Sequence, residues 1–356
     1  MRSVIIGTGS YLPEHIQTND EVERGTGDYS RSGKGEALDA FVRRVHGGIT
    51  RHRVAPGEST SDMATQAARI AIADAELSCG DVDLIVLATF TSDYKLPQAG
   101  GIVQANMGSK AKFIQVDAAC SGFIDGMMVA HSLMESQGYE TAVVIGADTT
   151  SCVLDPGKYL PLTVFGDGAG AAVVRREKDL DDYGVQSFSA GSDGHLGDYV
   201  WAPAGGSKMP CSQEVLDQGL QYLRFKFSEI NPWAVQRMTQ CTREALARAG
   251  IGLQDVDWVV PHQASSTLVM EVARQLELPP EMFVLTYPDT GNTSAASIPI
   301  ALDRANRRGD FADRDWVVMP AVGAGMAWNA MTYRWYDYRN RRPPARPAVE
   351  PTTGGE

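Results

Sequence analysis

Three residues of this sequence could perform chemistry together. Cys120 lies in VDAACSGFIDGMMVA (residues 116–130), His262 in WVVPHQASST and Asn292 in YPDTGNTSAASIPIAL. Each follows a short extended pattern and precedes a helical one, so each is predicted in a turn that follows a strand. Such turns carry the functional side chains in layered α/β proteins. A thiol, an imidazole and a carboxamide in one place make a coherent centre for nucleophilic catalysis.

Cys120 is predicted at the first turn of a helix. The apolar residues that follow it have helical spacing: Phe123, Ile124, Met127, Met128 and Ala130. The free N–H groups and the dipole at a helix N-terminus favour a thiolate, which indicates a nucleophile. The alternative is a small core residue, as most unpaired cysteines are. That structural interpretation is preferred for the other four cysteines, which lack this context: Cys79, Cys152, Cys211 and Cys241.

His262 and Asn292 each have a structural alternative as well. A histidine at a rigid strand end could exchange a proton or donate to a developing oxyanion, but it could also be a satisfied core residue. An asparagine between a glycine turn and a helix could be a helix cap. Beside a histidine, Asn292 could instead hold an enolate oxygen as a neutral donor.

Two glycine-rich loops bring backbone close to a neighbour. VFGDGAGAAVV (164–174) and AVGAGMAWNA (321–330) could supply N–H groups for an oxyanion hole, or they could serve only tight packing. The early GTGS (7–10) is followed by Pro13 and by no helical pattern. A dinucleotide-binding loop is therefore not expected there.

The elements around these residues form a repeat. Residues 71–91 and 244–264 each read as an alanine-rich helix, a turn, Asp-Val-Asp and an apolar strand. About 30 residues later, two strand–turn–helix segments match, and a third pair, TAVVIGADTT and DWVVMPAVGAG, follows in the same order. The apolar strands have the composition of strands buried on both faces. Two βα-rich halves of similar design are predicted.

Composition limits the function classes. The chain has 356 residues, 43% hydrophobic content and a net charge of −12. This acidity argues against nucleic-acid binding. No apolar run is long enough for a membrane span, and the N-terminus does not resemble a signal peptide. Cysteines without CxxC or zinc spacing predict reduced thiols in the cytoplasm and no metal site.

The order DAACSGF, FGDGAGAAVV, PHQA, TGNTSAASIPIAL and GAGMAW strongly resembles β-ketoacyl-acyl carrier protein synthase III, the decarboxylating branch of the thiolase superfamily. The resemblance covers residues 1 to about 336. It implies an α/β thiolase fold, a five-layered αβαβα sandwich of two duplicated halves, and a homodimer. The expected divisions are residues 1–180 with the nucleophile, 181–340 with the histidine and asparagine, and a flexible tail at 341–356.

The same resemblance implies the roles of individual residues. Cys120 would take an acyl group from a CoA or carrier-protein thioester, and His262 and Asn292 would hold the enolate left when a malonyl thioester loses CO2. The backbone N–H groups of Cys120 and Ala324 would form the oxyanion hole. The product would be a 3-oxoacyl thioester, and no cofactor beyond the thioester substrates is implied. Arg224, Lys226 and Arg274 match segments that dock the acyl carrier protein, although each could be an ordinary solvated charge.

The sequence departs from the family in several places. The tryptophan and arginine that clamp the CoA adenine are missing; the tryptophan's neighbourhood offers Phe41 or Val42. Thr267 replaces an arginine after HQA, and residues 24–37 carry extra sequence. Leu96 stands where phenylalanine often closes the acyl tunnel across the dimer, which predicts a primer bulkier than acetyl. Together these changes favour a specialised paralogue, for a secondary metabolite or a signal molecule, over priming of ordinary fatty-acid synthesis.

Two other functions compete with the condensing enzyme. An acyltransferase would move the acyl group from Cys120 to an alcohol or amine and would release no CO2. A non-catalytic partner subunit is disfavoured because Cys120 is present. Two features favour decarboxylative carbon–carbon bond formation: Asn292 is present, and GAGMAW lacks the second cysteine of a thiolase.

Overall fold

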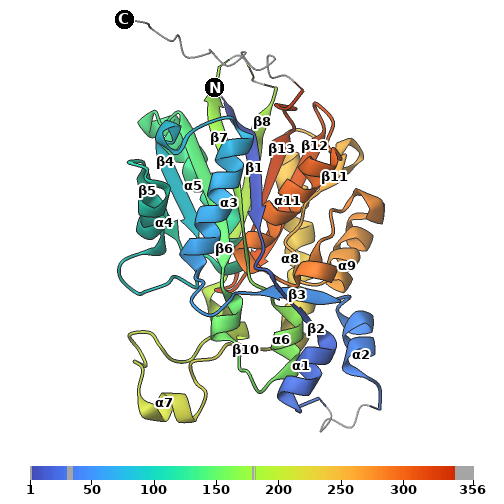
Figure 1. The fold of residues 1–356 in the computed structure, drawn as a ribbon. Helices are drawn as coiled ribbons and strands as arrows, with labels where there is room; N and C mark the ends of the chain where they lie inside the picture. Colours follow the sequence, from blue (N-terminus) through green and yellow to red (C-terminus); the bar gives the residue numbers. More distant parts are fainter. Residues whose placement is uncertain (1, 30–34, 179, 181, 341–356) are drawn as a thin grey trace, which may run out of the picture.

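The computed structural model describes residues 2–29, 35–178, 180 and 182–340 (Figure 1). The tail predicted at 341–356 lies outside the described residues, as does part of the extra sequence at 24–37. The strands are β1 (Arg2–Tyr11), β2 (His15–Thr18), β3 (Thr50–Arg53), β4 (Leu84–Ala88), β5 (Lys112–Val116), β6 (Thr141–Asp148), β7 (Gly168–Glu177), β8 (Gly184–Ser192), β9 (Val200–Trp201), β10 (Arg224–Phe225), β11 (Trp258–Val259), β12 (Trp316–Gly323) and β13 (Ala327–Arg334). The helices are α1 (Asn19–Thr26), α2 (Leu38–Val45), α3 (Thr60–Asp74), α4 (Ala99–Met107), α5 (Gly122–Gln137), α6 (Tyr159–Val164), α7 (Gln213–Asp217), α8 (Phe227–Arg248), α9 (Ser266–Leu276), α10 (Tyr287–Thr290) and α11 (Ser297–Arg308).

The first large sheet has the strand order β1-β7-β6-β4-β5. β4 runs parallel to β5 and β6, whereas β7 runs antiparallel to β1 and β6. Every residue of β4 and β6 is buried. Their continuous apolar sequences follow from that position, because helices cover both faces of the sheet.

The second large sheet repeats the strand directions of the first, but its fifth strand is reduced to a single bridge. Its order is β11-β12-β13-β8, with β11 parallel to β12 and β13 antiparallel to both neighbours. Beyond β11, a single parallel bridge joins Val259 to Phe283. Thus β8, β13, β12, β11 and the Phe283 bridge correspond to β1, β7, β6, β4 and β5. The predicted repeat is confirmed. The predicted division after residue 180 falls between β7 and β8, and the domain boundaries stay a prediction.

The helices complete five layers, as predicted. α3 and α4 pack on one face of the first sheet, and α8 and α9 pack on one face of the second (Figure 1). α5 and α11 lie between the two sheets, where one apolar cluster joins Ile124 and Met127 of α5 to Met319 and Met331 of the second sheet. The layers therefore follow the order α, β, α, β, α, and α5 and α11 form the central one.

Two glycines allow the halves to approach closely. A Cβ built on Gly146 of β6 would lie 2.2 Å from the carbonyl oxygen of Ala295. A Cβ on Gly323 of β12 would lie 2.8 Å from the backbone nitrogen of Ser121. Any larger residue would push apart the turns that follow the strands. The turn at Ala295, in the C-terminal half, therefore packs directly on β6 of the N-terminal half. The turn at Ser121, in the N-terminal half, packs in the same way on β12 of the C-terminal half.

Candidate active site

Cys120 lies in the short 3-10 turn η3 (Ala119–Ser121), between β5 and α5. Ala119 before it has a φ of 45°, an uncommon conformation for a residue with a side chain. Asn329 of β13 donates to the Ser121 carbonyl at 3.1 Å and so ties the turn to the second sheet. The turn is thus held in one shape by both halves of the chain.

The thiol of Cys120 is not the preformed thiolate that its helix position suggested. Cys120 keeps some exposure because it lines a cavity. The atoms packed around the sulfur nevertheless desolvate the charged form and raise the pKa to about 12. Burial therefore outweighs the helix N-terminus, and this expectation was wrong for the chain without substrate. Something must lower the cost of the thiolate during reaction.

His262 follows β11 and is held on two sides. Its backbone N–H donates to Pro320 of β12 at 2.9 Å, and its Nδ1 lies 2.7 Å from the Ser297 hydroxyl at the start of α11. The residue is 2% exposed. Burial lowers its pKa to about 3, so the imidazole is neutral at pH 7. A neutral imidazole suits hydrogen bonding to an oxyanion better than it suits accepting a proton from a thiol.

Asn292 lies between α10 and the 3-10 turn η8 (Ser294–Ala296). Its backbone N–H donates to Val164 at 2.8 Å, and its carbonyl accepts from Gly166 at 3.0 Å. Its side-chain Oδ1 accepts from the Ser294 backbone N–H at 2.9 Å. This bond fixes the orientation of the carboxamide and leaves the amide nitrogen as its donor group.

One cavity of about 480 Å³ brings the predicted residues together. Cys120, His262, Asn292 and Ala324 all line it. Aromatic side chains form much of the remaining wall: Phe90, Phe165, Trp201, Phe225, Phe227 and Trp233. The site is therefore a largely apolar chamber with a few polar groups, which is the usual character of a small-molecule site.

An arm carries β9, α7 and β10 (Figure 1), and its two strands contribute Trp201 and Phe225 to the lining of this cavity. Exposure alternates along residues 224–227, which run from β10 into the start of α8: Arg224 and Lys226 are exposed, whereas Phe225 and Phe227 are partly buried and line the cavity. The ring of Phe225 stacks on Phe165 at 5.2 Å and on Phe227 at 5.0 Å between centroids.

The residues expected to dock a carrier protein are largely paired within the chain. Lys226 lies 2.5 Å from Asp198, and Arg274 makes two bonds to Glu271 at 2.7 and 2.8 Å. Arg224 is exposed on β10. Leu96, expected in the acyl tunnel, is 84% exposed and does not line the cavity of its own chain. Its predicted role depends on a second chain and stays a prediction.

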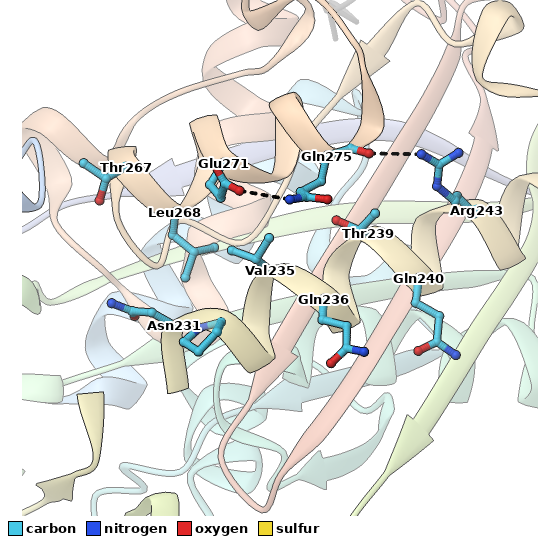
Figure 2. Close-up of a pocket in the computed structure, with 11 residues that line it drawn as sticks. Asn231, Val235, Gln236, Thr239, Gln240, Arg243, Thr267, Leu268, Glu271 and Gln275 are labelled. Atoms are coloured by element: carbon cyan, nitrogen blue, oxygen red, sulfur yellow. Dashed lines mark hydrogen bonds between the residues drawn. The ribbon is translucent and has the colours of Figure 1, made fainter. Parts of the chain in front are cut away.

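A second hollow of about 680 Å³ lies beside the cavity, between α8 and α9 (Figure 2). It shares Asn231 and Leu268 with the cavity. Its charged lining residues are engaged: Arg243 donates to the Gln275 carbonyl at 3.0 Å, and Glu271 pairs with Arg274. Although this hollow is larger, it contains none of the candidate catalytic residues.

Sequence reasoning missed a buried carboxylate beneath the site. Asp148, the last residue of β6, is fully buried. Its Oδ1 accepts from Thr89, Thr91 and the Phe90 N–H at 2.9 to 3.0 Å, and its Oδ2 accepts from the Ala295 N–H at 3.2 Å. A polar residue at the end of the apolar run AVVIGAD was the one available signal. Burial raises its pKa to about 6.

The described residues form neither a cluster typical of a metal site nor a helix typical of a membrane span. They contain no group of three or more His, Cys, Asp or Glu side chains arranged to hold a metal ion. In the same part of the chain, none of the helices combines the length and apolar character needed to span a membrane.

The chain is similar to known proteins over most of its length. Residues 114–194 match the family model for 3-oxoacyl-[acyl-carrier-protein] synthase III, and residues 246–335 match the model for its C-terminal part. The β-ketoacyl-[acyl-carrier-protein] synthase III of Caldanaerobacter subterraneus subsp. tengcongensis is 38% identical over 333 residues, covering 93% of this chain and 97% of that protein.

Solved structures give the same picture. The 3-oxoacyl-(acyl carrier protein) synthase III of Pseudomonas aeruginosa superposes with a TM-score of 0.84 at 34% identity, covering 94% of this chain and 98% of that one. The priming β-ketosynthase of a polyketide biosynthetic pathway also has a TM-score of 0.84, at 27% identity, covering 94% and 97% of the two chains.

Proposed function

Because the chain belongs to the 3-oxoacyl-[acyl-carrier-protein] synthase III family, we propose that it joins an acyl group to a malonyl thioester by decarboxylative Claisen condensation. The observation that carries the proposal is the shared cavity of Cys120, His262, Asn292 and Ala324. A nucleophile, two neutral hydrogen-bond donors and a glycine-rich turn there meet the needs of both half-reactions.

In the first half-reaction, the Cys120 thiolate attacks the carbonyl carbon of an acyl thioester. The tetrahedral oxyanion is held by the backbone N–H groups of Cys120 and Ala324. The bond from carbon to the donor sulfur then breaks, and the donor thiolate leaves and takes a proton from solvent. Each oxyanion donor lowers the barrier by about 3 kcal/mol.

In the second half-reaction, a malonyl thioester occupies the same cavity. His262 and Asn292 donate to its thioester carbonyl. When the bond to the carboxylate breaks, CO2 leaves and its electron pair remains as the enolate. The enolate carbon attacks the acyl-Cys120 carbonyl, and the carbon–sulfur bond breaks to release the 3-oxoacyl thioester. The low pKa of His262 supports this role, because a neutral imidazole keeps its N–H as a donor over the whole physiological range.

The primer is proposed to be bulkier than acetyl. The aromatic lining contributed by Phe165, Phe225 and Phe227 favours a large apolar group. Leu96 is proposed to enlarge the tunnel further when a second chain presents it. These features support a specialised paralogue rather than the enzyme that starts ordinary fatty-acid synthesis.

The proposed partners are a second copy of the chain and an acyl carrier protein, with acyl-CoA as the alternative donor. β5 is an edge strand of its sheet with partly buried side chains, and the neighbouring loop exposes Tyr94 by 61% and Leu96 by 84%. Edge strands of this kind are usually covered, and pairing with the same edge of a second copy would cover it by two-fold symmetry. No cofactor beyond the thioesters is proposed. The free cysteines suit a reducing compartment such as the cytoplasm.

The test uses intact-mass spectrometry. The protein is incubated with acyl-CoA and acyl-carrier-protein donors of increasing size, and malonyl-carrier protein is added afterwards while CO2 is measured. We expect a bulky acyl mass on the wild type, its removal with CO2 release, and no loading of Cys120→Ala. Loading that malonyl thioester neither clears nor decarboxylates would instead show an acyltransferase to an alcohol or amine. Loading by acetyl alone would refute the bulky primer.

A further inference from the structure

Ser294 belongs to η8, and this turn packs against both η3, which carries Cys120, and β6, which ends at the buried Asp148. Ser294 is fully buried in η8, and its hydroxyl makes no hydrogen bond of standard geometry within the described part of the chain. The same hydroxyl lowers the pKa of both Cys120 and Asp148, because it can donate to the charged form of either. A buried hydroxyl without a fixed partner is uncommon and calls for a functional explanation.

The backbone places Ser294 firmly in this position. Its N–H donates to Asn292 Oδ1 at 2.9 Å, and the next N–H, of Ala295, donates to Asp148 Oδ2 at 3.2 Å. Its φ of 53° is in the left-handed region, which costs energy and persists only when surrounding structure enforces it. The turn therefore holds this serine against the two elements that carry Cys120 and Asp148.

The two oxygens of Asp148 differ in a way that suits a relay. Oδ1 accepts three hydrogen bonds, whereas Oδ2 accepts one, from Ala295. A carboxylate oxygen has two lone pairs, so Oδ2 can accept a second donor. The Ser294 hydroxyl is the group next to it that lacks a partner.

We propose that Ser294 and Asp148 form a proton relay that generates the thiolate of Cys120. The S–H bond of Cys120 breaks and its proton passes to the Ser294 oxygen, while the Ser294 proton passes to Asp148 Oδ2. One negative charge moves from the carboxylate to the sulfur, and no other reactant is needed. The proton returns by the same route when the acyl group leaves Cys120. Ser294 then acts on the nucleophile directly, and Asp148 is a positioning residue that acts through Ser294.

This relay explains how a thiol with a high pKa can react. A thiolate beside an ionised Asp148 would place two negative charges in a buried site, which is costly. Internal transfer keeps a single charge there. His262 is the weaker acceptor, because its pKa of about 3 lies below the value of about 6 for Asp148. The other titratable groups nearby are Asp117 and His262 in the cavity and Cys152 beside Asp148.

The relay gives a distinctive pH profile for alkylation of Cys120 by iodoacetamide. Internal transfer does not change the number of bound protons. Thiolate formed in this way is therefore independent of pH above the titration of Asp148 near pH 6, and it declines below that pH. The wild-type alkylation rate should be level above about pH 6.5 until direct ionisation of the thiol overtakes internal transfer, whereas a simple thiol of high pKa gains about tenfold per pH unit throughout. Site-resolved mass spectrometry measures the rate at Cys120 apart from the exposed cysteines.

Ser294→Ala removes the bridge and keeps the turn, since the Asn292 and Ala295 bonds use backbone N–H groups. The level region should fall by about tenfold or more, because the thiolate loses the hydroxyl that donates to it. The matched control is Thr293→Val: Thr293 is equally buried and its hydroxyl also lacks a partner. Its profile should equal that of the wild type. A steadily rising wild-type profile, an unchanged Ser294→Ala profile or an equal effect of Thr293→Val would overturn the relay.

A second measurement separates the relay from general damage to the site. In a Cys120→Ala background, decarboxylation of malonyl-carrier protein needs no thiolate, so adding Ser294→Ala should lower its rate far less than Ser294→Ala lowers alkylation of Cys120. An equal loss there would show a structural role and refute the relay. The relay rests on the proposed function only for its use of Cys120 as nucleophile, and alkylation needs no substrate. A protein with the level profile but without condensation would retain the relay and lose the proposed function.

Discussion

The two halves of the molecule end corresponding strands in turns of opposite electrostatic character. In the first half, the turns after β4, β5 and β6 gather around the buried carboxylate of Asp148, and they include Cys120. In the second half, the turns after β11 and after the Phe283 bridge carry His262 and Asn292, whose side chains bond to a hydroxyl and to a backbone N–H. The two copies of the scaffold thus supply different groups. The first copy places a carboxylate near the Cys120 thiol, and the second places two neutral donors, His262 and Asn292, where they can hydrogen-bond a negatively charged oxygen.

The comparison predicts that Asn292 acts mainly in the malonyl half-reaction, so Asn292→Ala should show the largest separation between the two steps. Loss of one preorganised donor lowers the rate of malonyl decarboxylation by about 100- to 1,000-fold, while acyl loading of Cys120 stays within about threefold. Loading by intact mass and CO2 release measure the two steps separately. Asn292→Ala also removes the oxygen that accepts the Ser294 N–H. The control is therefore Asn292→Asp, which keeps an oxygen acceptor at this position but lacks the amide N–H donor. Equal losses in both steps would remove the division between the halves.

The contact between the halves can be disturbed without touching a reactive group. Gly146→Ala places a methyl group against the Ala295 carbonyl oxygen, 2.2 Å from the Cβ position. Overpacking of this kind costs about 1–3 kcal/mol in the free energy of unfolding, which urea denaturation measures. Because η8 would shift, loading and decarboxylation should both fall. Gly138→Ala provides a contrast: Gly138 ends α5 with open space around its Cβ position and a φ of 77°. The Gly138→Ala variant should have a lower free energy of unfolding, whereas the rates of acyl loading and decarboxylation should not change.

His262 and Asp148, which are both buried, should change the free energy of unfolding in opposite directions as the pH rises. The folded pKa of His262, about 3, lies below its ordinary value of 6.5. Its contribution is complete above pH 6.5 and is lost as the pH falls toward 3. The folded pKa of Asp148, about 6, lies above 3.8. Its contribution is complete below pH 3.8 and is lost as the pH rises to 6.

Comparison with His262→Gln isolates the histidine from the other shifted groups. Over pH 4 to 6.5, the free energy of unfolding of the variant relative to the wild type should improve as the pH falls, by up to about 1.4 kcal/mol per pH unit. Urea titrations at several pH values give this difference. A constant difference across the window would mean that His262 is charged in the folded protein.

The smallest effect on activity is expected for Arg274, which lies outside the turns that carry Cys120, His262 and Asn292. Arg274 already pairs with Glu271 on the exposed surface of α9, and exposed pairs contribute little. Arg274→Ala should change KM for a carrier-protein substrate by less than about threefold and leave the unfolding midpoint unchanged. A tenfold rise in KM, with acyl-CoA kinetics unaffected, would assign Arg274 to carrier docking.

The sequence predicted the features that depend on local pattern. Asp-Val-Asp and the apolar strands predicted the repeat, and ordered motifs around Cys120, His262 and Asn292 indicated the family and the cavity-lining residues. The sequence could not predict contacts between distant segments. Asp148 was missed because its bond to Ala295 joins residues 147 positions apart. The thiolate at Cys120 was wrongly expected because a helix start is visible in sequence, whereas the packing that desolvates the sulfur is not.

The central layer of α5 and α11 has a consequence for synthesis of the chain. α11 packs on β1 and β7, yet its residues, 297–308, are translated long after β7 ends at Glu177. At about 5–20 residues per second, the ribosome needs roughly 10 s to make the intervening segment. For that interval the inner face of the first sheet is covered by α5 alone, with α11 missing from β1 and β7, and the site lacks His262 and Asn292. A nascent chain halted before α11 should recruit chaperones strongly, and release from them should coincide with the first catalytic competence of the full-length chain.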